Sequence, residues 1–125
     1  MTAKIASEVL QKRLAKALKL AGDTHTIEDI QHAVARGEMQ CFANEDSFVI
    51  TEISQTPKAR YLNIFLAVGN MSVVSFLPDI EKFAEDNNCQ WVQAIGRPGW
   101  KAILPKIGYE ETHVVFVKNL GNKNG

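Results

Sequence analysis

The amino-acid sequence predicts an α/β fold: a single mixed, mostly antiparallel sheet with helices on both faces, in the element order α α β β β α β α β. The first observation is that apolar residues recur every three or four positions up to Arg36, as in helices that bury one face. The second is a change to period-two alternation from Glu38 to Val68, which is typical of strands. The third is a helical segment between Val68 and another strand-like run, which indicates two parallel strands.

Two helices are expected near the N-terminal end of the chain. Residues 2–20 carry an apolar stripe, with lysines on the opposite face. The second helix covers about Ile27 to Arg36, and Thr26 and Asp29 have the spacing of a capping box at its start. Gly37 supplies the stop signal of this second helix.

Three strands are expected to follow as an antiparallel meander. They cover Met39–Ala43, Ser47–Ser54 and Arg60–Val68, and polar turn residues separate them. The third strand, RYLNIFLAV, is apolar almost throughout its centre, so we expect it to be covered on both faces of the sheet.

The second half of the chain alternates helices and strands. A helical segment covers Met71 to about Asn87, and Pro78 indicates either a helix that starts near the proline or a helix kinked there. A strand is predicted at Cys89–Ile95, then a short helix at Pro98–Leu104 and a last strand at Tyr109–Val117.

One domain is expected to account for the whole chain of 125 residues. Within it, we distinguish a basic amphipathic helix over residues 1–22, an α/β domain over residues 23–120 and a flexible tail over residues 121–125.

The charge pattern argues against several classes of partner. The 14 basic and 14 acidic side chains balance, so no overall field attracts nucleic acid or an anionic membrane. Residues 1–20 hold five basic side chains and one acid, which indicates either a solvated basic helix or a docking helix for an acidic partner. No apolar run approaches the ~18 residues of a membrane span. Cys41 and Cys89 are interpreted as small buried residues of a soluble protein in a reducing compartment.

No catalytic or metal-binding constellation is evident in the sequence. The histidines His25, His32 and His113 lack a partner at a ligand spacing, and the carboxylate pairs lie in turns or on predicted polar faces. We therefore assign no catalytic residue and no metal ligand. The end of the third strand differs, because backbone amides around Gly69 can hold a single anion weakly.

The segment Gly96–Lys101, GRPGWK, is the most distinctive part of the chain. Its two glycines permit a sharp exit from a strand, and Pro98 favours the start of a helix. Two interpretations are open. Either Trp100 packs beneath the sheet while Arg97 binds nearby carbonyl groups, or both form an exposed recognition patch at the carboxyl end of a strand.

The element order and several stretches resemble the GNAT acetyltransferase superfamily, over roughly Thr26 to Leu120. The stretches are F-L-A-V-G-N, an acidic helix ending in N-C, then G-R-P-G-W-K-A-I-L-P-K-I-G-Y and a terminal V-K-N-L. They are similar to stretches in short GNAT-like proteins of tailed phages and prophages. The resemblance implies that the strands ending at Val68 and Ile95 part, at the place where the pantetheine arm of acetyl-coenzyme A inserts.

Two working parts of the superfamily differ in this chain. The superfamily holds the pyrophosphate of coenzyme A in an Arg/Gln-x-x-Gly-x-Gly/Ala loop, whereas Ala67–Val73 has a single glycine and no arginine. A tyrosine of the superfamily often protonates the leaving thiolate. Alignment on Gly108 and Tyr109 places Leu104 at that position, and leucine donates no proton.

Two functions are implied by the resemblance. The first is a degenerate, non-catalytic virion or assembly component without a cofactor, which contacts other phage structural proteins through Arg97 and Trp100. Such a protein would reside in the host cytoplasm during synthesis and then in the virion. The alternative is a divergent acyl-coenzyme A-dependent N-acetyltransferase, with acetyl-coenzyme A bound at Val68, Gly69 and Asn70. The missing loop and the missing acid favour the first function.

Overall fold

The computed structural model describes residues 8–20, 23–44, 47–69, 71–95 and 98–121. The chain divides into two compact units, Met1–Ala94 and Ile95–Gly125, here termed unit 1 and unit 2. All the strands of the described residues belong to unit 1.

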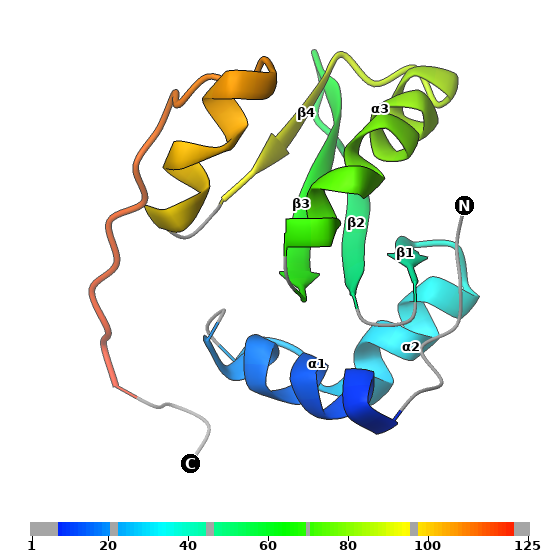
Figure 1. The fold of residues 1–125 in the computed structure, drawn as a ribbon, viewed down its shortest axis with the longest axis vertical. Coiled ribbons are helices and arrows are strands. Elements are labelled where there is room, and N and C mark those ends of the chain that lie inside the picture. Colours follow the sequence, from blue (N-terminus) through cyan, green and yellow to red (C-terminus); the bar gives the residue numbers. More distant parts are fainter. Residues whose placement is uncertain (1–7, 21–22, 45–46, 70, 96–97, 122–125) are drawn as a thin grey trace. The chain divides into compact units, whose positions relative to one another are not determined.

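The sheet of unit 1 has four strands in the order β1-β2-β3-β4 (Figure 1). They are β1 (Met39–Ala43), β2 (Phe48–Gln55), β3 (Arg60–Val68) and β4 (Trp91–Ala94). The first three strands pair antiparallel, whereas β3 and β4 pair in parallel. A parallel neighbour cannot be reached by a tight turn, and a helical crossover connects these two strands. The predicted mixed, mostly antiparallel sheet is confirmed.

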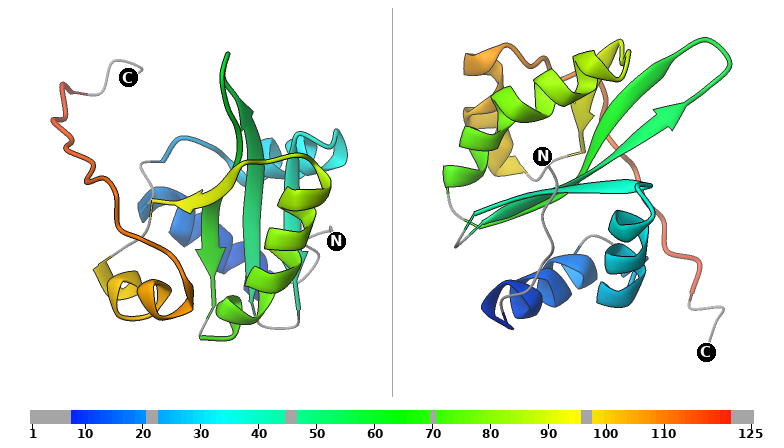
Figure 2. Two further views of the ribbon diagram at one scale, coloured as in Figure 1. Left: turned by 90° about the horizontal axis from the view of Figure 1, so that it is seen from above. Right: turned by 90° about the vertical axis from the view of Figure 1, so that its right-hand side faces the viewer.

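Helices cover both faces of this sheet, as Figure 2 shows. The helices α1 (Glu8–Leu20) and α2 (Ile27–Ala35) lie on one face, and α3 (Leu77–Asp86) lies on the other. This three-layer arrangement confirms the predicted α/β fold class.

The core of unit 1 is divided between the two faces of the sheet. The face under α1 and α2 buries an apolar cluster made of Leu14, Ala17, Leu18, Ile30, Ala33, Met39, Cys41, Phe48, Ile50, Leu66 and Val68. On the opposite face, Phe42 of β1 meets Phe83 of α3 edge to face, with 6.1 Å between the ring centroids. Buried apolar area contributes roughly 25 cal/mol per Å², so both layers stabilise the sheet.

The start of α2 agrees with the predicted capping box. The Thr26 side chain accepts a hydrogen bond from the Asp29 backbone N–H at 3.1 Å, and the Asp29 carboxylate accepts one from the Thr26 N–H at 2.9 Å. These bonds use amides that the first helical turn leaves free. The bond from the Thr26 backbone is the main cause that lowers the pKa of Asp29 below its ordinary value.

This capping box predicts a pH dependence of stability. Because the folded chain lowers the pKa of Asp29 below 3.8, the carboxylate stabilises the fold above that pH, and this contribution is lost as the pH falls through the folded value. The variant Asp29→Asn keeps an oxygen acceptor but cannot ionise. Thermal unfolding of both proteins between about pH 6 and about pH 2 is expected to show a gap in Tm that closes at the acid end. A gap that does not change with pH would contradict this role of Asp29.

The connection from β3 to α3 begins irregularly. The 3₁₀ helix η1 occupies Met71–Phe76, and the regular helix α3 begins at Leu77 with Pro78 in its first turn. The first interpretation of Pro78, a helix start, is therefore confirmed. Proline is tolerated there because the amides of the first turn have no partner within the helix.

Unit 2 departs from the prediction in both of its elements. In place of one helix at Pro98–Leu104, it has two short 3₁₀ helices, η2 (Pro98–Ala102) and η3 (Leu104–Ile107). The predicted last strand at Tyr109–Val117 is wrong, because these residues have no regular secondary structure. Its β-branched residues favour an extended backbone, but a strand also needs a neighbouring strand to accept its hydrogen bonds.

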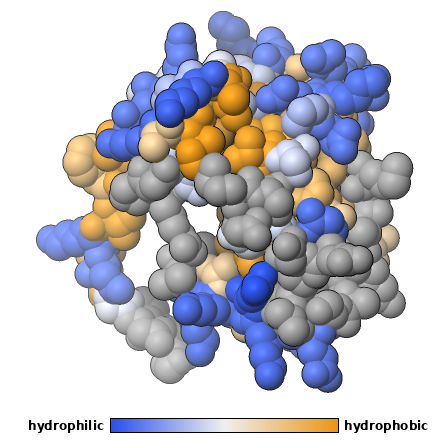
Figure 3. All heavy atoms as spheres, viewed as in Figure 1, coloured by the Kyte–Doolittle hydropathy of each residue, from blue (hydrophilic) through white to orange (hydrophobic). Residues whose placement is uncertain are grey.

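The residues from Tyr109 to Gly121, termed the C-terminal segment, expose large apolar side chains. Val114–Val117 are between 57% and 92% exposed, and Leu120 is 75% exposed. Hydrophobic side chains along this part of unit 2 reach the surface on the left of Figure 3. Of the described helices, none combines the length and apolar character needed to cross a membrane.

Candidate functional site

One edge of β3 is open toward its C-terminal end. The parallel pairing with β4 covers only Tyr61–Ile64, opposite Trp91–Ala94, whereas β3 continues to Val68. On its other side, β3 stays paired with β2 as far as Val68. No strand of the described residues pairs with the β4 side of Phe65–Val68, here termed the open edge. Alternate N–H and C=O groups of a strand point to each side, so the open edge presents backbone donors and acceptors.

The parting of β3 and β4 agrees with the geometry that the family resemblance implies. The pairing ends at Ile64 and Ala94, one residue before Ile95, and only β3 continues beyond it. An extended ligand with amide groups can bind such an edge in the way that an added strand does. The open edge is therefore the candidate site.

Gly69 ends β3 and is required there by close packing. Its φ of +131° is one that L side chains rarely adopt. A Cβ at this position would lie 2.5 Å from Ser47 Oγ and 2.9 Å from Ser47 Cα, just before β2 begins. Gly69 thus holds the end of β3 against the start of β2, and this contact fixes where the open edge ends.

Of the residues predicted to bind acetyl-coenzyme A, the structure describes Val68 and Gly69. The Val68 side chain is buried in the core cluster, so its peptide group is the part available to a ligand. Gly69 is exposed, and Asn70 lies outside the described residues. The binding role of these three positions remains a prediction.

Of the two predicted partner-binding residues, the structure describes only Trp100. It lies in η2 and is half-buried, which matches neither a fully buried anchor nor an open patch. The Trp100 carbonyl accepts a hydrogen bond from the Ile103 N–H at 3.1 Å. Arg97 lies outside the described residues, so the recognition patch of Arg97 and Trp100 remains a prediction.

Leu104, the residue aligned with the thiolate acid of the superfamily, begins η3. It is half-buried, and its carbonyl accepts a hydrogen bond from the Tyr109 N–H at 3.1 Å. This bond is a backbone contact within unit 2. Its side chain has no proton to donate.

His25 is a candidate that the sequence did not reveal. Its ring packs against Phe65, the first residue of the open edge, with 5.0 Å between centroids and an interplanar angle of 66°. Its Nδ1 lies 2.7 Å from Thr24 Oγ1. His25 precedes α2 and Phe65 lies in β3, forty positions later, so no local spacing could have indicated the contact. The contact brings a titratable imidazole to the candidate site.

A cavity of about 350 Å³ lies beside His25, between α2 and the sheet. Its lining includes the carboxylates of Asp29, Glu38 and Glu52 and the guanidinium of Arg36. Arg36 donates to both oxygens of Glu38 at 3.0 Å, which lowers the pKa of Glu38 and raises that of Arg36. The lining thus holds three carboxylates and one guanidinium, and this excess of acidic groups favours a cation.

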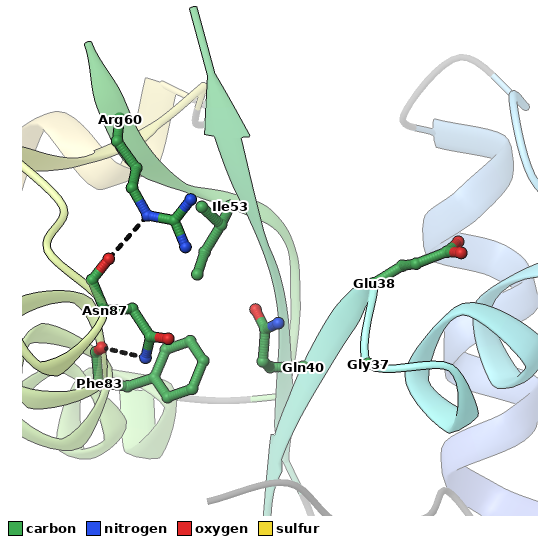
Figure 4. Close-up of a pocket in the computed structure, with 7 residues that line it drawn as sticks. All are labelled: Gly37, Glu38, Gln40, Ile53, Arg60, Phe83 and Asn87. Atoms are coloured by element: carbon green, nitrogen blue, oxygen red, sulfur yellow. Dashed lines mark hydrogen bonds between the residues drawn. The ribbon is translucent and has the colours of Figure 1, made fainter.

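A second cavity of about 430 Å³ lies on the α3 side of the sheet (Figure 4). Its lining combines polar and apolar side chains: Gly37, Glu38, Gln40, Ile53, Arg60, Phe83 and Asn87. Arg60 begins β3, so this cavity lies at the end of the strand opposite the open edge. Sequence reasoning missed it, because its residues come from four separate segments of the chain.

Two aromatic side chains stack on the parallel pair of strands in unit 1. Tyr61 and Trp91 stack across the parallel pair β3 and β4, with 5.0 Å between centroids and 8° between planes. Within the described ranges, no group of three or more His, Cys, Asp and Glu side chains could hold a metal ion.

Comparison with known proteins reveals similarity in fold. No family model matches the chain, and no curated protein matches it. A wild-type protein of Thermus thermophilus is similar, with a TM-score of 0.63 and 20% identity over 90% of this chain and 95% of that one. An acetyltransferase of Trypanosoma brucei has a TM-score of 0.62 and 9% identity, over 94% and 97% of the two chains.

A third similar structure is glucosamine-6-phosphate N-acetyltransferase from Arabidopsis thaliana, with a TM-score of 0.57 and 11% identity. The match covers 94% of this chain and 97% of that one. Sequence identities this low establish similarity in fold and do not establish a shared activity. The chain therefore has the α/β fold of GNAT N-acetyltransferases, as its sequence predicts.

Proposed function

We propose that the chain binds an acyl-coenzyme A thioester along the open edge and transfers the acyl group to an amine. The observation that carries this proposal is the unpaired β4 side of Phe65–Val68. The pantetheine arm is extended and contains amide groups, so it can pair with this edge as a strand would. The fold shared with structures described as an acetyltransferase and an N-acetyltransferase supports the same proposal.

In the proposed reaction, the cavity beside His25 binds the amine that accepts the acyl group. Its excess of carboxylates favours an ammonium-bearing acceptor, and His25 lies against the first residue of the open edge. In the proposed step, the amine nitrogen attacks the thioester carbonyl carbon and the C–S bond breaks. Before the attack, His25 takes one proton from the bound ammonium and frees the amine lone pair; a second N–H proton then passes through water to the thiolate, since Leu104 has no proton to donate. Backbone N–H groups of the open edge stabilise the oxyanion that forms.

Binding is tested by titrating the full chain with three ligands in a calorimeter. Acetyl-coenzyme A contains both the arm and the phosphorylated nucleotide, acetyl-pantetheine contains the arm without the nucleotide, and adenosine 3′,5′-bisphosphate contains the phosphorylated nucleotide without the arm. Because Ala67–Val73 has no glycine-rich phosphate loop, acetyl-pantetheine is expected to bind within about tenfold of acetyl-coenzyme A. The bisphosphate is expected not to bind. Amides of Phe65–Val68 should then exchange more slowly with solvent when acetyl-pantetheine is added.

Either of two results would contradict the proposal. Binding of the bisphosphate as tight as that of acetyl-coenzyme A would mean that the phosphates, and not the open edge, hold the ligand. No heat from either thioester at millimolar concentration would remove acyl-coenzyme A as a ligand altogether.

The C-terminal segment supports a second candidate function, a non-catalytic protein that binds other proteins. A run of exposed apolar side chains at Val114–Val117 is typical of a surface that a partner covers. The partner class that the sequence resemblance implies is a structural protein of a tailed phage. A chain that binds no thioester would leave this function as the proposal.

A further inference from the structure

We propose that the cavity at the end of α3 binds a small organic monocarboxylate. The cavity holds about 430 Å³, which is within the range of sites for small molecules. Every residue that lines it belongs to unit 1. The proposal does not depend on acyl-coenzyme A, because β3 separates the two sites: nine residues from Arg60 to Val68 span roughly 26 Å.

Arg60 provides a cation that is held in place and lacks an acidic partner. Its Nε donates to the Asn87 backbone carbonyl at 2.7 Å, and its Nη1 reaches Gln55 Oε1 at 3.4 Å. Both contacts leave Nη2 without a hydrogen bond among the described residues. None of the described ion pairs includes Arg60, although its side chain is half-buried. A half-buried guanidinium without an acidic partner favours binding of an anion.

Gln40 provides a second donor that lines the cavity. Only 6% of Gln40 is exposed, and its Oε1 accepts a hydrogen bond from Thr51 Oγ1 at 2.8 Å. Its NH₂ group has no partner among the described residues. Figure 4 shows the Gln40 amide and the Arg60 guanidinium both directed into the space between β1, β2 and the end of α3. The Gln40 NH₂ group, which reaches the cavity, is thus a second donor for a ligand acceptor.

The charges around the cavity select a singly charged ligand. Arg36 holds both oxygens of Glu38, so these two charges compensate and Arg60 contributes the remaining positive charge. A monocarboxylate matches this single positive charge, whereas a phosphate dianion would keep one uncompensated negative charge in the cavity. A carboxylate has one oxygen for Arg60 and another for the Gln40 amide, while the remainder of the molecule can contact Ile53 and Phe83.

The test is a titration of the full ¹⁵N-labelled chain, observed by nuclear magnetic resonance. The signals to follow are the Arg60 Nε–H and the Gln40 side-chain NH₂. The probes are benzoate, the uncharged benzamide of nearly the same shape, and inorganic phosphate. Benzoate is expected to shift both signals saturably, and at least about tenfold more tightly than benzamide or phosphate. This comparison uses the unmodified protein, so it does not depend on a variant that folds.

A pair of variants assigns the binding to Arg60. Arg60→Gln is expected to weaken benzoate binding at least about tenfold. The control Lys82→Gln removes the same charge from an exposed position on α3 and is expected to change benzoate affinity by less than about twofold. The proposal is overturned if benzamide binds as tightly as benzoate, if phosphate shifts the same signals equally, or if Lys82→Gln weakens binding as much as Arg60→Gln.

Discussion

The variant Gly69→Ala is expected to lower the free energy of unfolding by about 3 kcal/mol. Two costs combine at this position. The φ of +131° strains any residue that has a Cβ, and the new methyl group would lie 2.5 Å from Ser47 Oγ and 2.9 Å from Ser47 Cα. The backbone atom matters more than the hydroxyl, because Ser47 is fully buried before β2 and cannot move aside as a flexible side chain can. The measurement is equilibrium unfolding in urea.

Gly37→Ala is the matched control for Gly69→Ala. Gly37 also has a positive φ, +77°, but a Cβ there meets nothing within 4 Å. Its substitution carries the conformational cost alone, about 1 kcal/mol. Adding Ser47→Gly to Gly69→Ala should restore part of the stability, since it removes the Oγ and Cβ that the methyl group meets. Equal losses for Gly69→Ala and Gly37→Ala would show that packing against Ser47 contributes nothing.

The local signals of the sequence were sufficient for most of unit 1. Strands β1 and β3 occupy the predicted ranges Met39–Ala43 and Arg60–Val68, because alternation and turn residues mark both ends of each. The capping box at Thr26 likewise depends on residues three positions apart. Such features are decided within one segment, so the chain reveals them without its fold.

The last predicted strand failed because strand formation is not a local property. Tyr109–Val117 has the β-branched composition of a strand, but nothing in its sequence states which neighbour would pair with it. The candidate site also depends on contacts that local sequence patterns do not predict. The resemblance implied a ligand site at the end of β3, yet the role of Gly69 depends on Ser47, and the position of His25 depends on Phe65. Residues far apart in sequence determine both.

The variants Phe48→Ala and Phe116→Ala are expected to differ strongly in their free energy of unfolding, because one ring is buried in the core and the other is exposed on the C-terminal segment. Phe48 is fully buried in the cluster under α1 and α2, so its truncation removes packed atoms and leaves a cavity. The expected loss is about 4 kcal/mol in the free energy of unfolding, a large share of the stability of a domain this size.

Phe116 carries the same ring but is 92% exposed, so Phe116→Ala is expected to change the free energy of unfolding by less than about 0.5 kcal/mol. Urea unfolding of the two variants and the parent at one protein concentration measures both effects. A loss above about 1 kcal/mol for Phe116→Ala would mean that its ring is buried in the folded chain in solution. That outcome would remove the exposed apolar surface on which the protein-binding function rests. A loss confined to Phe48→Ala would leave Val114–Val117 as an apolar surface that stabilises nothing in its own chain, and contact with a partner would then be its remaining physical role.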